Sequence, residues 1–367
     1  MPFLMNLLPY RPVATGLSRY TERLLDGWIH TINDSAPLQL RIDDSGNAEL
    51  SRDITLPKVQ KSPRMRWLQR NGLVQHGTSV RDLVSHVDAD IIYSPYTDFI
   101  MELHNKPQII TCHDLIPLYF PGSKRAYFRS KFLLPLHLHR AAKIVAISKS
   151  VAEILISQGF PSARIEVIPN GIEQVDDPIC SPTTQDMLLL ARHGRNKNIP
   201  LALQGFAHFC RNNTDWTGKL CIVGHHTPAT NKLFALSRDL CIDHKVIWIE
   251  HLAPFQLEEC IRRSFCLLST SFMEGFDYPV FEAQARGVPT LLSRIPVHDE
   301  LHQNNALFFD LDDNGTSLAG VMLELARDSY LWRHLSLTGL SHARNFSIQR
   351  QISSLKCLIQ QVAGTAH

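Results

Sequence analysis

Short, strongly apolar runs alternate with longer amphipathic runs along nearly all of the chain, which has 367 residues. The short runs are typical of buried strands. The longer runs, whose apolar residues recur every three or four positions, are typical of helices. Strands joined through helices pair in parallel and are covered on both faces. The alternation therefore predicts an α/β protein built on doubly wound parallel sheets.

The expected elements form two series. In the first half, strands are expected at residues 3–8, 91–93, 109–112 and 144–147, and helices at 17–29, 80–87, 125–140 and 151–158. In the second half, strands are expected at 187–190, 219–223, 246–249, 266–268, 290–292 and 307–309, and helices at 200–209, 231–240, 254–263, 278–285 and 315–327.

The chain is too long for one ordinary core, which predicts two domains. The turn formed by Pro169, Asn170 and Gly171, with the polar stretch that follows it, marks the break. We expect one Rossmann-like domain at residues 1–172 and a second at 173–345. A final helix at 346–367, capped by Ser347, is expected to pack back across both domains.

Composition narrows the functional classes. The net charge of +2 is too small to indicate a nucleic-acid partner. Eight cysteines are scattered without CxxC pairs or metal-ligand spacing, which favours reduced thiols and no metal site. No apolar run approaches the roughly 18 residues of a membrane helix, and the N-terminal string MPFLMNLLPYRP lacks a basic leader. These features predict a cytoplasmic protein.

One basic segment leaves two interpretations open. Residues 52–81 carry seven lysines and arginines against one acid, Asp53, with Trp67 and Leu68 among them. Such a stretch can lie against anionic lipid headgroups at the membrane surface, or it can be a solvated basic loop. The basic residues are Arg52, Lys58, Lys61, Arg64, Arg66, Arg70 and Arg81.

The most informative stretch follows the strand expected at 266–268. Glu274 lies in this loop, and a helix is expected from Tyr278. Backbone N–H groups at a helix start, with Gly275 allowing close approach, suit a diphosphate or a sugar hydroxyl. A carboxylate such as Glu274 can accept hydrogen bonds from sugar hydroxyls, and Glu282, about one turn inside the helix, can hold a ribose diol. The alternative is that both glutamates are solvated surface acids.

The string EGFDYPVFEAQARGVPTLLS at residues 274–293 resembles the Glu-x7-Glu motif of the retaining family 4 glycosyltransferases, whose usual form is close to EGFGLPxxEAxAxGxPVxxS. The resemblance implies the GT-B fold, in which two Rossmann-like doubly wound domains face each other across a cleft. The chain departs at Asp277 and Tyr278, where Gly-Leu is common, and at Arg286, where Cys or Ala is frequent. These departures bear on the identity of the sugar more than on the reaction.

The resemblance extends over most of the chain. The strings TCHDLIPLYFP (111–121), AAKIVAISKSVAEIL (141–155), IEVIPNGIE (165–173), SRIPVHDE (293–300) and NFSI (345–348) are similar to family segments in matching places. It implies that His113 lines the sugar site and that Gly16, after the first strand, lets backbone amides approach the donor phosphates. No GxGxxG or Walker A string occurs, so these are not features of a dinucleotide or P-loop site.

Basic residues follow the strand expected at 187–190. The family carries a basic residue and a lysine there, places taken by Arg192 and Lys197, and Arg195 can substitute for Arg192. Two cations at a strand end neutralise a diphosphate and stabilise it as a leaving group.

Within the family, the strings look most like bacterial O-antigen and surface-polysaccharide mannosyltransferases. This implies retaining transfer of mannose, or of a deoxyhexose such as rhamnose, from a GDP-sugar to a lipid-linked glycan, by same-face attack. No metal or other cofactor is expected besides the nucleotide sugar. The implied catalytic residues are Glu274 and His113, and the implied donor-binding residues are Gly16, Arg192, Lys197, Gly275, Phe276, Asp277, Tyr278 and Glu282. The rivals are a synthase with a small sugar acceptor, an epimerase of similar build and a non-catalytic glycan-binding subunit.

Overall fold

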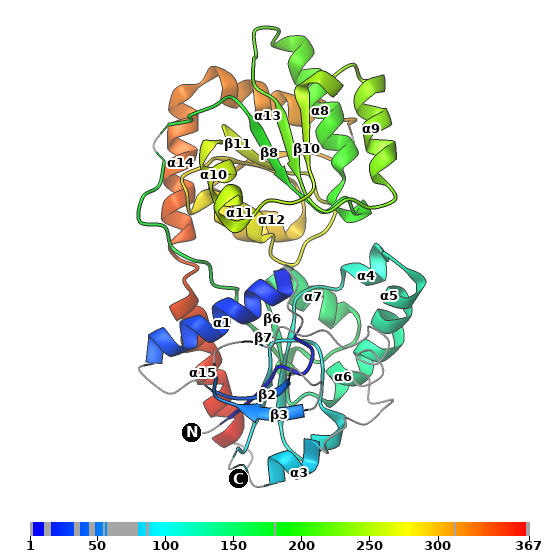
Figure 1. Ribbon diagram of the computed structural model, residues 1–367, viewed down its shortest axis with the longest axis vertical. Helices are drawn as coiled ribbons and strands as arrows, with labels where there is room; N and C mark the ends of the chain where they lie inside the picture. The colour runs from blue at the N-terminus through cyan, green and yellow to red at the C-terminus, as the bar shows by residue number, and fades with distance from the viewer. Residues whose placement is uncertain are drawn as a thin grey trace. The chain divides into compact units, whose positions relative to one another are not determined.

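The computed structural model describes residues 3–10, 16–32, 37–43, 48–53, 56, 80–85, 87, 89–179, 181–311 and 313–364. The chain divides into two compact units (Figure 1). The first comprises Met1–Gly171 and Ile348–His367, and the second comprises Ile172–Ser347. The break predicted after residue 172 stands one residue from this boundary.

Within the described residues, the first unit contains a seven-stranded sheet in the order β3-β2-β1-β4-β5-β6-β7. The strands are β1 (Leu4–Asn6), β2 (Leu38–Ile42), β3 (Ala48–Ser51), β4 (Ile92–Ser94), β5 (Gln108–Cys112), β6 (Lys143–Ala146) and β7 (Ile165–Val167). All neighbours pair in parallel except β2 and β3, which are antiparallel. The predicted parallel sheet is thus present, with one antiparallel edge strand.

The helices of the first unit include one long pair. The helices are α1 (Gly16–Ile32), α3 (Val80–Ser85), α4 (Ile116–Tyr119), α5 (Lys124–Phe128), a π-helical turn at Arg129–Leu133, α6 (Leu134–Arg140), α7 (Lys149–Ser157) and α15 (Ile348–Gly364), with short 3₁₀ turns at Met101–Leu103 and Ser162–Arg164. The final helix, α15, packs against α1 inside this unit, where Gly27 leaves room for Ile348. Its predicted passage across the second domain stays a prediction.

The second unit contains, among its described residues, a six-stranded sheet in the order β10-β9-β8-β11-β12-β13, parallel throughout. The strands are β8 (Met187–Leu190), β9 (Leu220–Val223), β10 (Val246–Ile249), β11 (Cys266–Ser269), β12 (Thr290–Ser293) and β13 (Leu307–Phe309). The helices are α8 (Ile199–Asn212), α9 (Thr230–Asp239), α10 (Pro254–Arg263), α11 (Tyr278–Gln284), α12 (Pro296–His302), α13 (Thr316–Arg327) and α14 (Ser329–Ala343), with 3₁₀ turns at Arg195–Lys197 and Asp243–Lys245.

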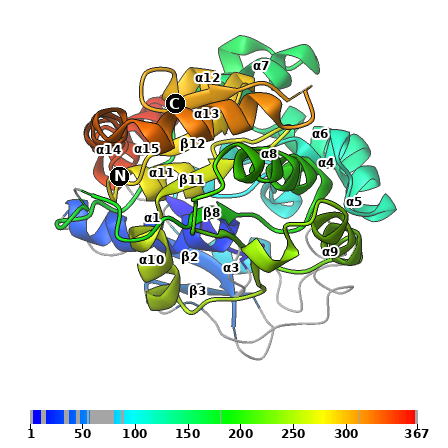
Figure 2. The ribbon, with the colours of Figure 1, turned by 90° about the horizontal axis from the view of Figure 1, so that it is seen from above.

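Alternate strand residues of the second unit face two different cores. Leu189 and Leu268 pack with α8 and α13 on one face, whereas Leu188 and Leu267 pack with α10 and α11 on the other. Figure 2 shows α8 on one side of β8 and β11, and α10 and α11 on the other. Because both faces are covered, the strands are apolar along most of their length, which is why the sequence pattern located them.

The strand order creates a reversal beside β8. The chain proceeds from β8 to β9 and β10 in one direction, then returns to place β11 on the other side of β8. The loops that follow β8 and β11 therefore leave neighbouring strand ends and diverge. In open α/β sheets such a point is where ligands bind, because the diverging loops leave a crevice beyond the strand ends.

Most predicted elements agree with the structure, and several elements were not predicted. Strands 187–190, 246–249 and 307–309 and helix 254–263 coincide with β8, β10, β13 and α10. The helix predicted at 125–140 is interrupted by the π-helical turn between α5 and α6. The elements without a prediction are β2, β3, β7, α4, α12 and α14. No helix in the described part of the chain combines the length and apolar character needed to span a membrane.

Helices α8 and α13 approach closely at Gly205. A Cβ atom there would lie 2.6 Å from Leu318 Cδ2 and 2.8 Å from Leu318 Cγ, and Leu318 is fully buried. Gly205→Ala is therefore expected to lower the free energy of unfolding by about 1–3 kcal/mol, because the added methyl overpacks this contact. Thermal or urea unfolding followed by circular dichroism measures the change.

Gly320 provides the matched control on α13, since a Cβ there would meet no atom within 4 Å. Gly320→Ala is expected to be neutral or to stabilise by up to about 1 kcal/mol, through helix propensity. Equal effects of the two substitutions would contradict the close approach of α8 and α13.

Candidate functional site

Two loops of the second unit are hydrogen-bonded to each other at the reversal in strand order. The loop after β8 contains the turn Arg195–Lys197, and the loop after β11 runs from Thr270 to Asp277. Thr270 Oγ1 donates to the Lys197 carbonyl at 2.9 Å, and the Phe272 N–H donates to the Asn196 carbonyl at 2.7 Å. These bonds fix the position of Lys197 relative to the loop that carries Glu274.

Lys197 lies between two carboxylates. Its Nζ is 2.7 Å from Glu274 Oε1 and 3.6 Å from Asp277 Oδ1. The Lys197 side chain is 19% exposed, compared with 8% for Glu274 and 2% for Asp277. Burial by itself favours a neutral amine, but the charges and hydrogen bonds of the two carboxylates raise the pKa of Lys197 above its usual range. The ammonium group is therefore present at neutral pH.

Asp277 is held by hydrogen bonds with two side chains and by the charge of Lys197. It precedes α11 with a left-handed backbone, at φ 61° and ψ 66°. Its Oδ2 accepts a hydrogen bond from Ser269 Oγ at 2.5 Å and lies 3.1 Å from His298 Nε2. Burial opposes ionisation, but the charge of Lys197 and the hydrogen bonds from His298 and Ser269 hold the pKa of Asp277 well below its usual range. Asp277 is therefore ionised.

Both ring nitrogens of His298 face oxygen acceptors. Its Nδ1 is 2.9 Å from the Ser293 carbonyl oxygen, and its Nε2 faces the Asp277 carboxylate. His298 is completely buried. Asp277 is thus the partner of both Lys197 and His298.

The pKa of Glu274 is shifted in the opposite direction to that of Asp277. Burial raises the pKa of Glu274, and the neighbouring charge of Asp277 adds to this, whereas the Lys197 ammonium and hydrogen bonds from Lys197 and Ser271 act against it. The net pKa is raised, because burial together with the Asp277 charge outweighs the stabilising contacts of Lys197 and Ser271. Glu274 is thus the more weakly stabilised anion of the cluster.

This arrangement suits an oxygen-rich anionic ligand. The Lys197 ammonium carries three N–H donors and lies 2.7 Å from Glu274, whereas Asp277 at 3.6 Å acts on it through charge. A positive group fixed at strand ends can stabilise charge that develops on a departing phosphate without reorganising during the reaction. A carboxylate beside it accepts hydroxyl hydrogen bonds. Cation and acceptor are therefore preorganised for a phosphate and a polyol on one ligand.

The other predicted residues of the second unit lie around this cluster in different ways. Arg192 and Arg195 are exposed in the loop after β8. Phe276 is buried and stacks on Phe281, with ring centroids 4.4 Å apart, so only its backbone remains to meet a ligand. Glu282 on α11 is 8% exposed. The alternative interpretation, that Glu282 is a solvated surface acid, is therefore wrong, and its expected contact with ribose stays a prediction.

Gly275 and Tyr278 complete the predicted loop. Gly275 directly follows Glu274, and Tyr278 is the first residue of α11, with its ring centroid 5.2 Å from that of Phe276. The loop thus runs directly from the carboxylate of Glu274 to the start of the helix, as the motif predicted.

His113 and Gly16 belong to the first unit. His113 Nε2 is 2.8 Å from the Pro95 carbonyl oxygen, and the ring packs edge-on against Tyr20 with centroids 4.5 Å apart. Burial lowers the pKa of His113 to about 4, with the Pro95 hydrogen bond acting against it. The ring is neutral at pH 7, with the proton on Nε2, so Nδ1 can only accept a hydrogen bond.

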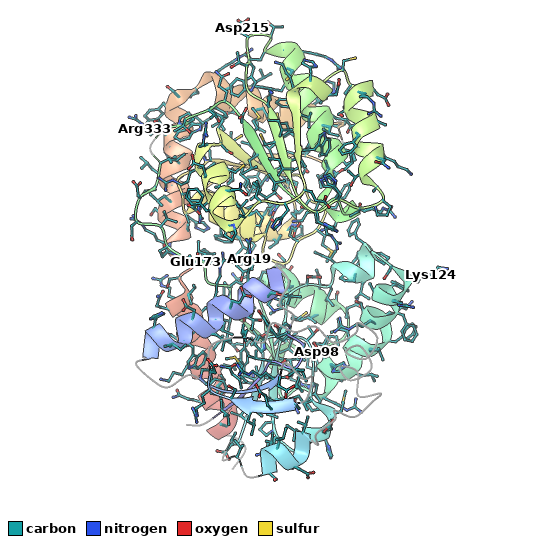
Figure 3. The ribbon with its side chains drawn as sticks, in the orientation of Figure 1. Arg19, Asp98, Lys124, Glu173, Asp215 and Arg333 are labelled. Carbon is teal, nitrogen blue, oxygen red and sulfur yellow. The ribbon has the colours of Figure 1, made fainter. Side chains whose placement is uncertain are left out.

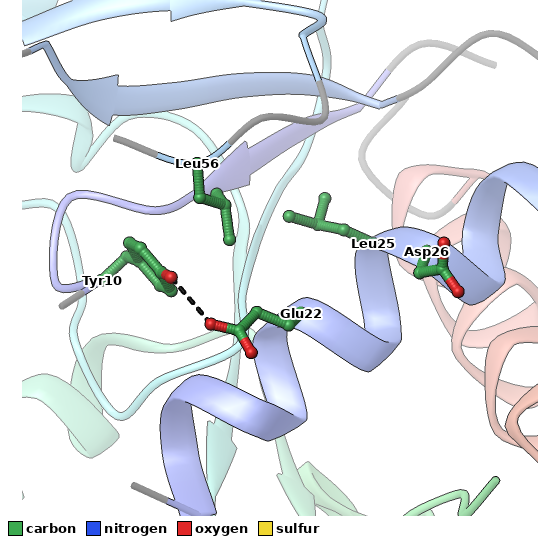
Figure 4. A pocket seen from close by; sticks show the side chains of 5 residues that line it. All are labelled: Tyr10, Glu22, Leu25, Asp26 and Leu56. Carbon is green, nitrogen blue, oxygen red and sulfur yellow. Dashed lines mark hydrogen bonds between the residues drawn. The ribbon is translucent and has the colours of Figure 1, made fainter. Parts of the chain in front are cut away.

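Gly16 begins α1, and a Cβ there would meet no atom within 4 Å. Packing among the described residues therefore does not require glycine at this position. The first unit also contains a cavity of about 240 Å³ that includes none of the predicted site residues (Figure 4). It is lined by Tyr10, Glu22, Leu25, Asp26 and Leu56, and the Tyr10 hydroxyl donates to Glu22 at 2.8 Å.

Two members of the buried cluster received no role from the sequence. His298 lies in the SRIPVHDE string and Ser269 at the end of β11, and both act on the carboxylate of Asp277. The one indication in the sequence is their position, because β11 and β12 are adjacent parallel strands whose carboxyl ends lie at the same edge of the sheet. Among the described residues, no group of three or more His, Cys, Asp or Glu side chains could hold a metal ion.

Several curated proteins are similar to this chain. It is 29% identical over 211 residues to the O-antigen chain mannosyltransferase RfbU of Salmonella typhimurium, a match that covers 56% of this chain and 57% of RfbU. It is 31% identical over 223 residues to the serotype-specific mannosyltransferase WbdA of Escherichia coli, covering 54% and 27% respectively. A lipopolysaccharide 1,6-galactosyltransferase of Salmonella typhimurium is 25% identical over 293 residues, covering 74% and 76%.

Solved structures share the fold at low sequence identity. A sucrose-phosphate synthase from Thermosynechococcus elongatus matches with a TM-score of 0.75 at 15% identity over the whole of both chains. Anabaena HepE in complex with UDP and glucose matches with a TM-score of 0.70 at 14% identity, over 98% of this chain and 100% of HepE. These neighbours are GT-B glycosyltransferases, which confirms the predicted fold class of two Rossmann-like parallel-sheet domains.

Two family profiles match consecutive parts of the chain. Glycosyltransferase Family 4 covers residues 40–174, and Glycosyl transferases group 1 covers residues 179–335. Together they include β7 and β8, the strands that flank the unit boundary, and the whole cluster around Lys197. The chain therefore belongs to the GT-B glycosyltransferases that combine a family 4 region with a group 1 region, as the Glu-x7-Glu string predicted.

Proposed function

We propose that this protein is a retaining hexosyltransferase of surface-polysaccharide biosynthesis. It moves mannose, or a deoxyhexose such as rhamnose, from a GDP-sugar to a lipid-linked glycan acceptor. The observation that carries the proposal is the Lys197 ammonium, held 2.7 Å from Glu274 at the reversal in strand order of a doubly wound sheet. Lys197 binds the donor diphosphate, and Glu274 binds hydroxyls of the transferred sugar.

The charges of the cluster support a diphosphate donor. The departing nucleoside diphosphate gains negative charge as the glycosidic bond to the sugar breaks, and a fixed cation lowers the energy of that state. Arg192 and Arg195 are exposed in the same loop and can reach a phosphate from the solvent side. Since lysine and arginine supply this charge, the proposed reaction needs no metal ion.

The identity of donor and acceptor is supported by the named relatives. RfbU and WbdA are both described as mannosyltransferases, one of them of the O-antigen chain. Other similar proteins are named lipopolysaccharide galactosyltransferases, which are also enzymes of surface glycans. If the transferred sugar is mannose, as in these relatives, the favoured donor is a GDP-sugar and the favoured acceptor is a growing lipid-linked glycan.

A second function is a synthase that joins a sugar to a small acceptor. It is favoured by similarity to the mannosylfructose-phosphate synthase of Agrobacterium fabrum, at 24% identity over 245 residues. The two functions differ in the acceptor. Transfer to fructose 6-phosphate in the absence of lipid would support the synthase. The anomeric configuration of either product, measured by NMR, tests retention.

A thermal-shift screen with GDP, UDP and ADP tests the donor base. A ligand present at 100 times its Kd adds about 2.7 kcal/mol of stability, which corresponds to a rise in Tm of about 5–10 °C for a unit of this size. GDP is expected to give this rise at a lower concentration than UDP or ADP. A larger response to UDP would replace the proposed GDP donor, and no response to any of the three would remove the nucleotide-sugar proposal.

Lys197→Met is expected to lower kcat/KM for transfer by about 100- to 1000-fold, as the loss of one preorganised donor to a developing oxyanion does in other enzymes. The substitution keeps most of the side-chain volume, and circular dichroism checks that the protein remains folded. Lys232→Met, at an exposed lysine on α9, is the matched control and should leave transfer unchanged. Arg192→Ala and Arg195→Ala, compared under the same conditions, decide which arginine supplies the second cation. Full activity of the Lys197 variant would reject the site.

Glu274→Gln is expected to raise thermal stability at pH 7–8 while lowering transfer activity. The raised pKa means that the folded protein binds a proton at Glu274 more tightly than the unfolded chain does. The free energy of unfolding therefore falls as the pH rises from the ordinary pKa of the unfolded glutamate through the raised pKa of the folded one. Glutamine cannot ionise and escapes this loss. The gain should disappear below about pH 4, where the unfolded glutamate is protonated too. Melting curves of both proteins from pH 4 to 8 measure it, and a less stable variant at pH 8 would contradict the assigned direction.

A further inference from the structure

The helical segment from α5 through the π-helical turn to α6 exposes an apolar stripe. Phe128, Phe132 and Leu136 recur every four residues and are 51%, 52% and 48% exposed. Tyr127 on the same segment and Tyr119 at the end of the preceding α4 are exposed as well. Figure 1 shows α4, α5 and α6 along one side of the first unit. Scattered exposed apolar residues are ordinary, whereas a contiguous group indicates an interaction surface.

The exposed aromatic rings are in contact with one another and with a lysine. The Phe128 and Phe132 ring centroids are 5.0 Å apart. Lys131 Nζ lies 5.3 Å from the centroid of Tyr127 and 5.9 Å from that of Phe132, and it donates a hydrogen bond to Tyr127 Oη at 3.0 Å. The side chains of the stripe therefore hold one another in place, and the Lys131 ammonium lies among the aromatic rings.

The opposite face fixes this surface to the unit. Leu134, His137 and Leu138 of α6 are buried, and His137 Nδ1 accepts a hydrogen bond from the Phe99 N–H at 3.0 Å. Ser123 caps the start of α5 by accepting from the Ala126 N–H. Packing of the opposite face therefore directs the aromatic side chains of the stripe toward the solvent.

The charged residues of the segment that carries the stripe are all basic. No aspartate or glutamate occurs between residues 115 and 152. Four of the basic residues in that range border the stripe and are exposed, namely Lys124, Arg125, Lys131 and Arg140. Figure 3 shows Lys124 projecting outward at the start of α5. Arg129 is engaged with Asp98, which is buried, so this acid does not neutralise the exposed cations.

We propose that this stripe, from Tyr119 to Arg140, binds the surface of a lipid bilayer that contains anionic headgroups. Aromatic side chains insert at the boundary between headgroups and acyl chains, while the surrounding lysines and arginines neutralise lipid phosphates. A second copy of the chain is the less suitable occupant. A symmetric contact would bring each cationic patch against its own equivalent, which is repulsive.

The proposal moves the membrane contact away from the segment that the sequence suggested. Most of residues 52–81 lie outside the described residues, and their part in lipid binding stays a prediction. The inference deepens the proposed use of a lipid-linked acceptor, and it rests on that function only for its purpose. Its test contains neither donor nor acceptor, so failure of vesicle binding and failure of glycosyl transfer are separate results.

The experiment is flotation of the purified full chain with vesicles of phosphatidylcholine, alone or mixed with phosphatidylglycerol. We expect binding to the anionic vesicles only, decreasing at high salt as the cationic contribution is screened. Phe128→Ser with Phe132→Ser, and separately Lys124→Glu with Arg125→Glu, should each weaken binding by about tenfold or more. All four side chains are exposed, so the melting temperature should not change.

Matched controls come from exposed residues of the second unit. Phe255→Ser with Tyr330→Ser removes two aromatic rings that are each 80% exposed, and Lys232→Glu with Arg238→Glu reverses two exposed cations on α9. Both controls should bind anionic vesicles like the original chain. Absence of vesicle binding, or equal loss with the stripe and control variants, would overturn the proposal. A dimer in light scattering that the Phe128 and Phe132 substitutions dissociate, without vesicle binding, would assign the stripe to a second copy.

Discussion

The position of one partly buried ammonium group, that of Lys197, depends on the whole topology of the second unit. Lys197 and Glu274 are far apart in sequence, and they meet because β11 returns to lie beside β8 after the chain has formed β9 and β10. The loops after these two strands are then joined by hydrogen bonds from the Phe272 N–H to the Asn196 carbonyl and from the Thr270 hydroxyl to the Lys197 carbonyl. A buried cation is tolerated only with charged or polar partners. The two carboxylates satisfy this requirement, and in doing so they hold the cation where a ligand entering beyond the strand ends can reach it.

The charges continue beyond Lys197 in an alternating series. Glu274 faces Lys197, Lys197 faces Asp277, and Asp277 faces His298, whose second nitrogen is held by a carbonyl of β12. Glu274, at the end of the series, contacts Lys197, whereas Asp277 contacts both Lys197 and His298. The group with the weakest electrostatic support is thus the one expected to meet the sugar, and a donor hydroxyl can supply the stabilisation that the protein withholds.

The sequence pattern located elements whose burial is regular. Strands β8, β10 and β13 are apolar along their length, so their bounds were predicted correctly. Helix α14 was not predicted because its buried face includes Ser336, Gly339 and Ala343, which carry little apolar signal. A Cβ at Gly339 would lie 3.1 Å from Gln284 Cγ, which is a tight approach. In the site, the motif identified Glu274 and Lys197. It could not identify the bonds of Asp277 to His298, 21 residues away, because these depend on the order of strands in the sheet.

Two of the three positions at which the chain departs from the usual family motif, Asp277 and Arg286, have partners of their own. Asp277 occupies a left-handed position where glycine is common, and its carboxylate offsets that strain by accepting from Ser269 and pairing with Lys197 and His298. Arg286 donates to Glu258 on α10 at 2.7 Å and to the Glu282 carbonyl at 2.7 Å, which ties α10 to α11. Oδ2 of Asp277 is engaged by Ser269 and His298, whereas Oδ1 lies 3.6 Å from Lys197 Nζ. The substituted side chains at 277 and 286 are thus held by contacts within the second unit.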